Sequence, residues 1–260
     1  MTTLDIKNPF GAPVYHEETL SSTFDAARHL AKNKENHGTV ITADFQESGR
    51  GRLKRSWASG RRENLLFTIL LRYTDYSSLP AAITLRTGLA VSLAIEELFP
   101  LLKGQVFVKW PNDIIIDKRK AVGILTETDG KTVYIGIGIN VSQTEFPVEI
   151  RSKAVSIKQA LPEGKFIDGN TRFSLLEKVL ISLHAEIDVP TKAWQERLLK
   201  RLYKKGETVV FAIGGSEGSA DSVSLVKGIL SGIGPAGELL IIHNGEKQER
   251  AFTSGELQAY

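Results

Sequence analysis

The sequence predicts an α+β protein built on a mixed β-sheet, followed by a small all-β module. Strand-like and helical segments follow one another in mixed order, which favours an α+β sheet over a doubly wound one. After Gly206 the helical pattern ends, and short alternating strands are separated by glycine-rich turns. We therefore expect one domain over residues 1–204 and a second over 205–260. The second is near the lower size limit for independent stability and should pack against the first.

The first half of the chain is predicted to contain a helix over 22–32, a strand over 39–45, a loop over 46–60, a strand over 65–71 and a helix over 80–99. The first helix opens with a Ser/Thr cap and carries apolar residues at helical spacing. The strand over 65–71 is a continuous apolar run, typical of a sheet buried on both faces. Charged residues interrupt the long helix, so we expect a buried helix and no membrane span.

The second half is predicted to contain short strands over 106–110, 114–117, 121–127 and 131–141, helices over 171–187 and 192–203, and strands over 209–213, 222–230, 238–242 and 247–253. The dipeptide Asp129-Gly130 is a hairpin signal between two of these strands. The last four strands form the all-β module.

From the composition and the N-terminal sequence, we expect a cytoplasmic enzyme or binding protein. The chain has no cysteine, which excludes disulfides, zinc–thiolate sites and cysteine nucleophiles. Its N-terminus lacks the basic-then-apolar pattern of a secretory signal. The net charge of +3 is too small to indicate nucleic-acid binding by itself.

Positive charge is concentrated in two loops. Residues 50–62 contain six basic residues and no acidic one, and a second cluster covers 118–120. Glycines alternate with arginines over 49–52, so the backbone can approach a ligand closely while the guanidinium groups supply charge. This pattern suits a phosphate or a carboxylate, and a solvated basic surface loop is the alternative.

Two further segments combine polar groups with strand ends. Residues 109–113 read Lys-Trp-Pro-Asn-Asp and place a cation, an amide and a carboxylate on one turn. A plain β-turn is the alternative, because Pro, Asn and Asp are favoured turn residues. Lys120 begins the next apolar strand, which directs it toward the same site.

Residues 136–140 read Gly-Ile-Gly-Ile-Asn and resemble a dinucleotide fingerprint only in part. No third glycine opens a helix, so we reject that interpretation. Glycines inside a strand indicate close approach by a ligand or another backbone. Ser22 and Thr23, at the start of the first helix, offer hydroxyls and free N–H groups to a polar acceptor.

Taken in this order, the motifs resemble those of the biotin–protein ligases over residues 15–257. The matching residues are Ser22-Thr23, Gly49–Arg52 with Arg55 and Trp57, Lys109–Asp113, Lys120 with Gly123–Leu125 and Glu127, Gly136–Asn140, and Ser254–Glu256. Only 21 residues precede Ser22, which is too few for the helix-turn-helix module of members that repress the biotin operon. The resemblance is therefore to the short class, and we expect no sequence-specific DNA binding.

The resemblance implies a fold, a reaction and partners. The fold is that of the class II synthetase-like biotin–lipoate ligase domain with a small C-terminal SH3-like β-barrel. The reaction activates biotin with ATP and Mg²⁺ to biotinyl-5'-AMP and transfers biotin to a lysine of a biotin carboxyl carrier protein, as in acetyl-CoA carboxylase. Related enzymes dimerise through sheet edges, so the resemblance allows a homodimer.

The resemblance also assigns site residues. Catalytic roles fall to Arg52, Lys120 and Asp113. Biotin binding falls to Ser22, Thr23, Phe24, Gln46, Gly49, Arg50, Gly51, Arg52, Trp57, Lys120, Gly123, Leu125, Gly136 and Gly138. ATP binding falls to Arg50, Arg52, Arg55, Asn112, Lys120 and Asn140, and no residue is assigned to a metal. Because the first step brings a carboxylate against a polyanion, cations must lie where the two meet.

Three alternatives stand beside this interpretation. A lipoate–protein ligase shares the fold and the carrier-lysine chemistry, but the intact motifs at 49–52 and 109–113 favour biotin. A nucleic-acid-binding protein using the loop 50–62 predicts a steep salt dependence and no release of pyrophosphate. A biotin-binding module without activation chemistry would need neither Arg52 nor Lys120.

Overall fold

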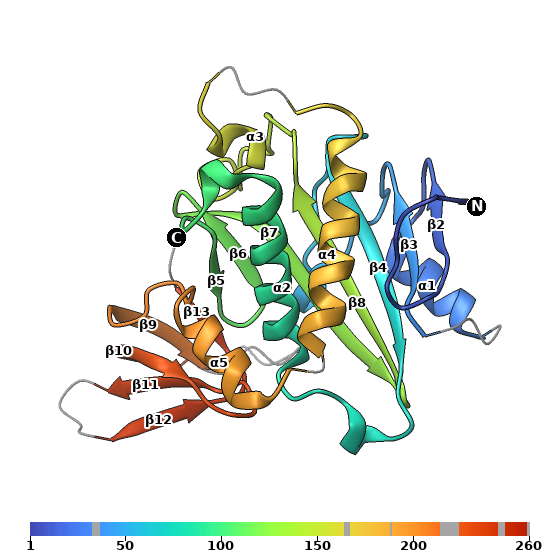
Figure 1. Cartoon of the computed structure of the whole chain (residues 1–260). Helices are drawn as coiled ribbons and strands as arrows, with labels where there is room; N and C mark the ends of the chain where they lie inside the picture. The colour runs from blue at the N-terminus through green and yellow to red at the C-terminus, as the bar shows by residue number, and fades with distance from the viewer. Residues whose placement is uncertain (33–36, 164–166, 188, 214–223, 244–247, 259–260) are drawn as a thin grey trace.

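The chain folds into two β-sheets that share one hydrophobic core (Figure 1). The computed structural model describes residues 1–32, 37–163, 167–187, 189–213, 224–243 and 248–258. The larger sheet has eight strands in the order β1-β2-β3-β4-β8-β7-β6-β5. In it β2 and β3 pair in parallel, whereas β3 and β4 pair antiparallel. The predicted α+β fold with a mixed sheet is confirmed.

The strands of the larger sheet are β1 (Thr2–Thr3), β2 (Val14–Glu17), β3 (Thr39–Ala43), β4 (Asn64–Arg72), β5 (Phe107–Lys109), β6 (Asp113–Ile116), β7 (Arg119–Asp129) and β8 (Thr132–Asn140). The α-helices are α1 (Thr23–Lys32), α2 (Ile83–Leu98), α3 (Ile157–Ala160), α4 (Thr171–Ile187) and α5 (Thr191–Leu199). Short 3-10 helices cover Arg52–Lys54, Tyr76–Ser78 and Pro100–Leu102. The smaller sheet contains β9 (Thr208–Ile213), β10 (Ser224–Ile233), β11 (Leu239–His243), β12 (Glu249–Phe252) and β13 (Glu256–Leu257).

The central strand β4 is buried on both faces, as its continuous apolar run predicts. Leu65, Phe67 and Ile69 pack in the core cluster that includes α2 and α4. Leu70, on the opposite face, packs in a separate cluster with Phe24 of α1. Because strand side chains alternate between faces, odd-numbered positions of β4 face α2 and α4, and even-numbered positions face α1. Figure 1 shows α2 and α4 side by side across the sheet.

The helix α2 is the most apolar segment of the chain. Residues 76–98, which include α2, are long and apolar enough to cross a membrane by length and composition alone, with a mean hydropathy of 1.4. However, 61% of the 18-residue window with this hydropathy is buried inside the fold, between the sheet and α4. A core helix has these properties, and the buried helix predicted for 80–99 is therefore found.

The smaller sheet is antiparallel, with the strand order β12-β11-β10-β9-β13. Its described pairings form an open sheet, because no pairing joins β12 to β13 among the described residues. Phe211 and Leu230 belong to the same core cluster as Trp194 and Leu198 of α5. This module therefore packs against the rest of the chain, and the boundary at 204/205 stays a prediction.

Two sequence expectations differ from the structure. The helix predicted over 192–203 ends at Leu199, and the chain then runs beside β5, where Leu202 forms a parallel bridge with Val108. The segment after Leu199 consists of turns around this single bridge, which is held by hydrogen bonds from the Val108 N–H to the Arg201 carbonyl and from the Tyr203 N–H to the Val108 carbonyl. The strands β1, β2 and β13 were not predicted, since segments of two to four residues are too short to show a period.

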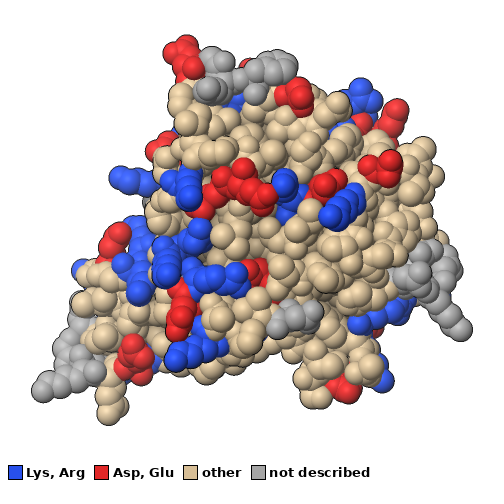
Figure 2. All heavy atoms as spheres, in the orientation of Figure 1, with Lys and Arg blue, Asp and Glu red and all other residues tan. Residues whose placement is uncertain are grey.

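Surface charges are mixed in sign on the face that carries α2 and α4. Figure 2 shows Lys and Arg side chains gathered at the left of this face, over the junction between the two sheets, with acidic side chains beside them. The basic loop of residues 46–60 lies on the other face of the sheet.

Candidate active site

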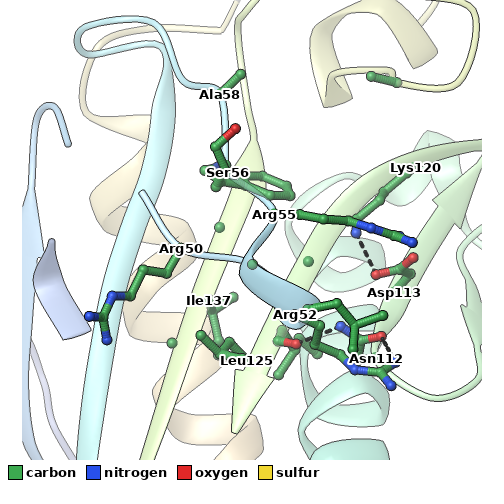
Figure 3. Close-up of a pocket in the computed structure, with 18 of the residues that line it drawn as sticks. Arg50, Arg52, Arg55, Ser56, Ala58, Asn112, Asp113, Lys120, Leu125 and Ile137 are labelled. Carbon is green, nitrogen blue, oxygen red and sulfur yellow. Dashed lines mark hydrogen bonds and ion pairs between the residues drawn. The ribbon is translucent and has the colours of Figure 1, made fainter. Parts of the chain in front are cut away.

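A cavity of about 640 Å³ lies between the sheet and the basic loop of residues 46–60. The strands β7 and β8 form its floor, and the loop forms its roof (Figure 3). Gly136 and Gly138 of β8 pair with Thr68 and Leu66 of β4, which are even-numbered positions. The glycines therefore face the α1 side of the sheet, and the cavity lies on that side.

The structure brings almost all of the predicted site residues to this cavity. Those that line it are Ser22, Thr23, Phe24, Gln46, Arg50, Gly51, Arg52, Arg55, Trp57, Asn112, Asp113, Lys120, Gly123, Leu125, Gly136, Gly138 and Asn140. Gly49 is the exception. It is buried within the loop, and its carbonyl accepts a 2.9 Å hydrogen bond from the Trp57 N–H. A Cβ at Gly49 would lie 2.7 Å from the Trp57 carbonyl oxygen, so Gly49 shapes the loop.

The indole of Trp57 lies flat on two glycines of the floor. Gly123 and Gly138 are cross-strand partners in β7 and β8. A Cβ at Gly138 would lie 2.5 Å from Cε2 of Trp57, and one at Gly123 would lie 2.7 Å from Cζ3. The indole nitrogen is buried without a hydrogen-bond partner in the described part of the chain. The close approach inferred from glycines inside a strand is therefore made by Trp57.

We expect Gly138→Ala to displace the Trp57 indole without unfolding the protein. The added methyl group overlaps the ring, and overpacking of this kind costs about 1–3 kcal/mol. Acrylamide should then quench more of the tryptophan fluorescence, since Trp110 and Trp194 are both buried and contribute little to quenching. Gly136→Ala is the matched control, because a Cβ there meets Phe24 at 3.0 Å. Equal quenching in both variants would contradict this placement of Trp57.

The N-terminus of α1 presents a small hydrogen-bonding group to the cavity. The backbone N–H and the hydroxyl of Thr23 both donate to Oε1 of Gln46, over 2.8 and 2.9 Å. The same hydroxyl shares a 2.9 Å hydrogen bond with Thr68. The Ser22 hydroxyl accepts from the Phe24 N–H over 3.2 Å. These polar groups are buried beside Phe24 and give one end of the cavity both donors and acceptors.

Lys120 and Asp113 form an ion pair on the opposite side of the cavity. Lys120 Nζ lies 2.6 Å from Asp113 Oδ1, as Figure 3 shows. The same ammonium lies 5.6 Å from the centre of the Trp57 ring, in a cation–π arrangement. The lysine therefore reaches from the start of β7 over the tryptophan toward the cavity.

Arg52 is held against the 109–113 turn. Its Nη1 donates to Oδ1 of Asn112 over 3.1 Å, and Nδ2 of Asn112 donates to the Ile124 carbonyl over 2.7 Å. Asn140 is similarly engaged, since its Nδ2 donates to the Val155 carbonyl over 3.1 Å. Both amides therefore line the cavity and also hydrogen-bond to the backbone of neighbouring segments.

The other two arginines of the loop have acidic partners from distant segments. Arg50 lies 3.1 Å from Asp25 of α1, and Figure 3 shows its side chain pointing away from Arg52. Arg55 makes two 2.9 Å hydrogen bonds with the Glu256 carboxylate of β13. The ion pair with Glu256 lowers the pKa of that carboxyl and joins the basic loop to the smaller sheet.

Lys109 is a cavity residue that the sequence-derived site assignment did not include. Its side chain is 2% exposed. Burial lowers the pKa of Lys109 to about 8, although the nearby carboxylates of Asp113 and Glu256 oppose the shift. It remains mostly protonated at pH 7. The signal was present in the sequence, since Lys109 opens the same turn motif as Asn112 and Asp113.

Other lining residues outside the assignment include Glu149, Lys153, Glu256 and Gln258.

A buried carboxylate closes the base of the basic loop. Asp44, at the end of β3, lies 2.8 Å from His16 Nε2, 2.8 Å from Arg62 Nε and 2.5 Å from Arg172 Nη2. The Arg62 N–H also donates to the Asp44 carbonyl over 2.9 Å. Burial alone would raise the pKa of Asp44, but the hydrogen bonds from these three side chains outweigh it and lower the pKa. Residues 44 and 62 thus hold together the two ends of the segment that carries Arg52 and Trp57.

The fold and the cavity together define a class of protein. It is an α+β domain in which a mixed sheet, with glycines at its surface, holds a small-molecule site beneath a basic loop. The ammonium groups of Lys109 and Lys120 and the guanidinium of Arg52 line one end, and the apolar slot of Trp57 and Leu125 lies beside them. Such a site suits an anionic ligand that carries an apolar portion. No cluster of three or more His, Asp or Glu side chains that could hold a metal occurs among the described residues.

Comparison with known proteins shows similarity to one family. Residues 17–142 match the Biotin/lipoate A/B protein ligase family. The chain is 40% identical to the bifunctional ligase/repressor BirA of Bacillus subtilis over 157 residues, which is 58% of this chain and 47% of that protein. It is 31% identical to the biotin–[acetyl-CoA-carboxylase] ligase of Mycobacterium tuberculosis over 141 residues, 54% of this chain and 52% of that protein. The chain thus spans about half the length of these curated relatives.

A solved structure matches over nearly the whole chain. The biotin protein ligase from Aquifex aeolicus, in complex with biotin and ATP, superimposes with a TM-score of 0.77 and 28% sequence identity. The match covers 95% of this chain and 99% of that one. The chain is therefore similar to the Biotin/lipoate A/B protein ligase family over residues 17–142 and to a solved biotin protein ligase over most of its length.

Proposed function

We propose that this protein is a biotin–protein ligase, which activates biotin with ATP to biotinyl-5'-AMP and transfers biotin to a lysine of a carrier protein. The observation that carries the proposal is the convergence of Arg52, Lys109 and Lys120 on one cavity beside an apolar slot. The names of the relatives support biotin and the acetyl-CoA carboxylase carrier as substrates. The carrier would be a biotin carboxyl carrier domain, and the reaction would take place in the cytoplasm.

In the first half-reaction, a biotin carboxylate oxygen bonds to the α-phosphorus of ATP. The bond between the α- and β-phosphates breaks, and pyrophosphate leaves. Two anions must meet, so preorganised cations at their junction lower the barrier. Lys120 is the central candidate, because an incoming anion can replace Asp113 as its partner. Arg52 and Lys109 flank the same region.

Biotin fits the slot beside Trp57. The walls would be Trp57, Leu125 and the glycine floor, with Phe24 at the end near α1. The ureido ring needs both donors and acceptors, which the group of Ser22, Thr23 and Gln46 can supply. Gly136 lets the Phe24 ring pack close to the floor at this end of the slot, since a Cβ there would lie 3.0 Å from that ring.

ATP would lie on the other side of Trp57. Arg52, Asn112, Asn140 and Lys120 line this part, and Arg55 reaches toward it from its ion pair with Glu256. Mg²⁺ bound to the phosphates would neutralise their charge, and Asp113 is the carboxylate placed to share its coordination. Mg²⁺ is commonly held by phosphates and one or two carboxylates.

In the second half-reaction, the carrier lysine nitrogen attacks the carbonyl carbon of the mixed anhydride. The new amide bond forms as the bond to the AMP oxygen breaks, and AMP leaves. The lysine ammonium must first lose a proton, and Asp113 is our candidate acceptor. We also propose that the protein binds no specific DNA sequence and inserts into no membrane, and a homodimer remains consistent with this function.

The direct test is incubation with ATP, Mg²⁺ and biotin, followed by addition of a biotin carboxyl carrier domain. We expect release of pyrophosphate and a mass increase of the carrier by one biotinyl group. Lipoate in place of biotin should give neither product. If pyrophosphate is released with lipoate and not with biotin, the protein is a lipoate–protein ligase and this proposal is wrong.

We expect Arg52→Gly to make the adenylate but to release it prematurely. Arg52 ties the loop to Asn112, and loss of a charged hydrogen bond of this kind costs about 1.5–3 kcal/mol. Glycine also makes the loop more flexible. The escaping anhydride should then label serum albumin about tenfold more than wild type does.

Arg61→Gly is the control for Arg52→Gly, because Arg61 stacks over Phe45 at 5.2 Å and lies outside the cavity. It should label albumin no more than wild type does. Arg52 is purely catalytic if Arg52→Gly makes no adenylate, and its retention role is wrong if that variant labels the carrier alone.

A further inference from the structure

We propose that Arg28 and Glu127 are positioning residues that hold the Phe24 wall of the biotin slot and thereby give the site its preference for the bicyclic ring of biotin. Neither Arg28 nor Glu127 lines the cavity. Glu127 ends the motif over residues 123–127, whose members Gly123 and Leu125 do line it. The proposal rests on the function proposed above, and it adds the contacts that fix the closed end of the slot.

Cross-strand pairs of β7 and β8 form rows across the floor of the cavity. On the α1 side of the sheet, Leu125 and Gly136 form the last row whose residues line the cavity. Glu127 and Tyr134 form the next row, and their side chains point to the same side because strand side chains alternate between faces. Rows on one face are about 7 Å apart, so this row lies immediately behind the end of the slot.

Arg28 covers this row from α1. It follows Phe24 by one helical turn, and residues four positions apart share one face of a helix. Its guanidinium carbon lies 5.6 Å from the centre of the Phe24 ring and 5.5 Å from the centre of the Tyr134 ring, and the two rings are 5.8 Å apart. Arg28 Nε is buried without a hydrogen-bond partner in the described part of the chain, which fits a guanidinium that lies on aromatic rings.

Glu127 fixes the position of this guanidinium. Arg28 Nη2 donates a hydrogen bond to Oε2 of Glu127 over 2.6 Å. The two side chains are 39% and 38% exposed, so the pair lies between the end of the slot and solvent. A half-exposed ion pair contributes little to the stability of the whole fold. It does restrict a long side chain that would otherwise sample many rotamers, and so keeps the cation on the rings.

Phe24 is the member of this group that meets the ligand. Its side chain is 2% exposed and lines the cavity. The ring packs on the floor at Gly136, and the Arg28 guanidinium contacts it from outside the cavity. A ring fixed in this way presents a rigid apolar wall, and a rigid wall distinguishes ligands that fill the slot to different extents.

The test compares biotin with desthiobiotin, which has the same ureido ring and carboxylate chain but lacks the sulfur-containing ring. Pyrophosphate release is measured with hydroxylamine as the acceptor of the activated carboxylate. In Arg28→Ala we expect the KM for biotin to rise about threefold, with kcat and the KM for ATP unchanged. Desthiobiotin makes less contact with the wall, so its KM should change little. The ratio of the two kcat/KM values should therefore fall about threefold.

Two further variants test whether the effect passes through Phe24. Glu127→Ala should raise the KM for biotin as much as Arg28→Ala does, because the carboxylate acts by holding the guanidinium. Phe24→Leu removes the ring, so Arg28→Ala should add nothing to the KM for biotin in that background. Independent increases from Arg28→Ala and Phe24→Leu that multiply in the double variant would overturn the proposal.

Lys178→Ala is the matched control. Lys178 and Glu97 form an exposed ion pair of the same 2.6 Å length between α4 and α2, on the other side of the sheet. Its loss should leave the KM values for biotin, desthiobiotin and ATP unchanged. A rise in this control as large as that in Arg28→Ala would show a general effect of a lost surface ion pair and contradict the positioning role.

The remaining outcomes distinguish this inference from the proposed function. If Arg28→Ala keeps the wild-type preference for biotin over desthiobiotin, the positioning role is wrong, while the ligase function stands on the activity of wild type. A parallel rise of the KM values for biotin, desthiobiotin and ATP would mean a general loosening of the site and would also contradict the inference. If wild type itself releases no pyrophosphate with biotin and ATP, the proposed function fails, and this inference fails with it.

Discussion

Lys120→Ala should reduce biotinyl-adenylate formation at least a hundredfold while leaving the fold intact. The ammonium of Lys120 lines the cavity, and its partner Asp113 is the group that an anionic transition state would replace. Removal of one preorganised contact to developing charge costs roughly 3–4 kcal/mol. The effect should appear in kcat for pyrophosphate release, because the contact strengthens as charge develops.

The loss should not come from unfolding. The side chain of Lys120 is 30% exposed, and Asp113 keeps a nearby cation in Lys109 when Lys120 is removed. The melting temperature should therefore stay close to that of wild type. Lys118→Ala, an exposed lysine on the turn before β7, is the control and should keep full activity. Near-normal pyrophosphate release by Lys120→Ala would remove Lys120 from the mechanism.

The sequence was sufficient for much of the fold because the decisive patterns are local. The continuous apolar run at 65–71 predicts a doubly buried strand, and β4 is one. The helix predicted over 171–187 is found with the same bounds as α4. The spacing of apolar residues and the residue types of turns can be recognised from neighbouring residues alone. By contrast, the end of α5 at Leu199 and the turns that follow it go with a bridge to β5, which lies about ninety residues earlier.

The motifs predicted which residues form the site. They did not predict the directions in which the side chains point. Nothing in the run Gly-Arg-Gly-Arg indicates that Arg50 turns toward Asp25 while Arg52 turns toward Asn112. The loop is irregular, so no period fixes which way successive residues point. Leu53 has a φ of 53°, in the left-handed region, which reverses the chain between Arg52 and Arg55. Contacts with distant segments decide these directions.

The hydrogen bonds from the two cavity asparagines to the protein backbone could not be predicted from the motifs either. Asn112 and Asn140 were assigned to the nucleotide, and both line the cavity. Each also hydrogen-bonds a backbone carbonyl twelve to fifteen residues away, at Ile124 and Val155. A polar residue in a motif has several hydrogen-bonding atoms, and sequence order does not divide them between ligand and wall.

The buried carboxylate of Asp44 had no signal in the sequence, because its three partners come from β2, the end of the basic loop and α4. We expect Asp44→Asn to destabilise the protein by about 3–5 kcal/mol at pH 7, since it leaves Arg172 buried without its counter-charge. Urea unfolding measures this loss. Asp5→Asn, an exposed carboxylate without an ion pair in the described residues, should change stability by less than about 0.5 kcal/mol.

The loss should also depend on pH in a defined direction. The pKa of Asp44 is lower in the folded protein than the ordinary value of 3.8, so its stabilising effect is complete above that value. It disappears as the pH falls through the lowered pKa, because the folded carboxylate is then protonated. The difference in unfolding free energy between wild type and Asp44→Asn should therefore be constant from pH 7 to about pH 5 and shrink below about pH 4. A difference that stays constant down to pH 2 would mean that Asp44 acts through its shape and not through its charge.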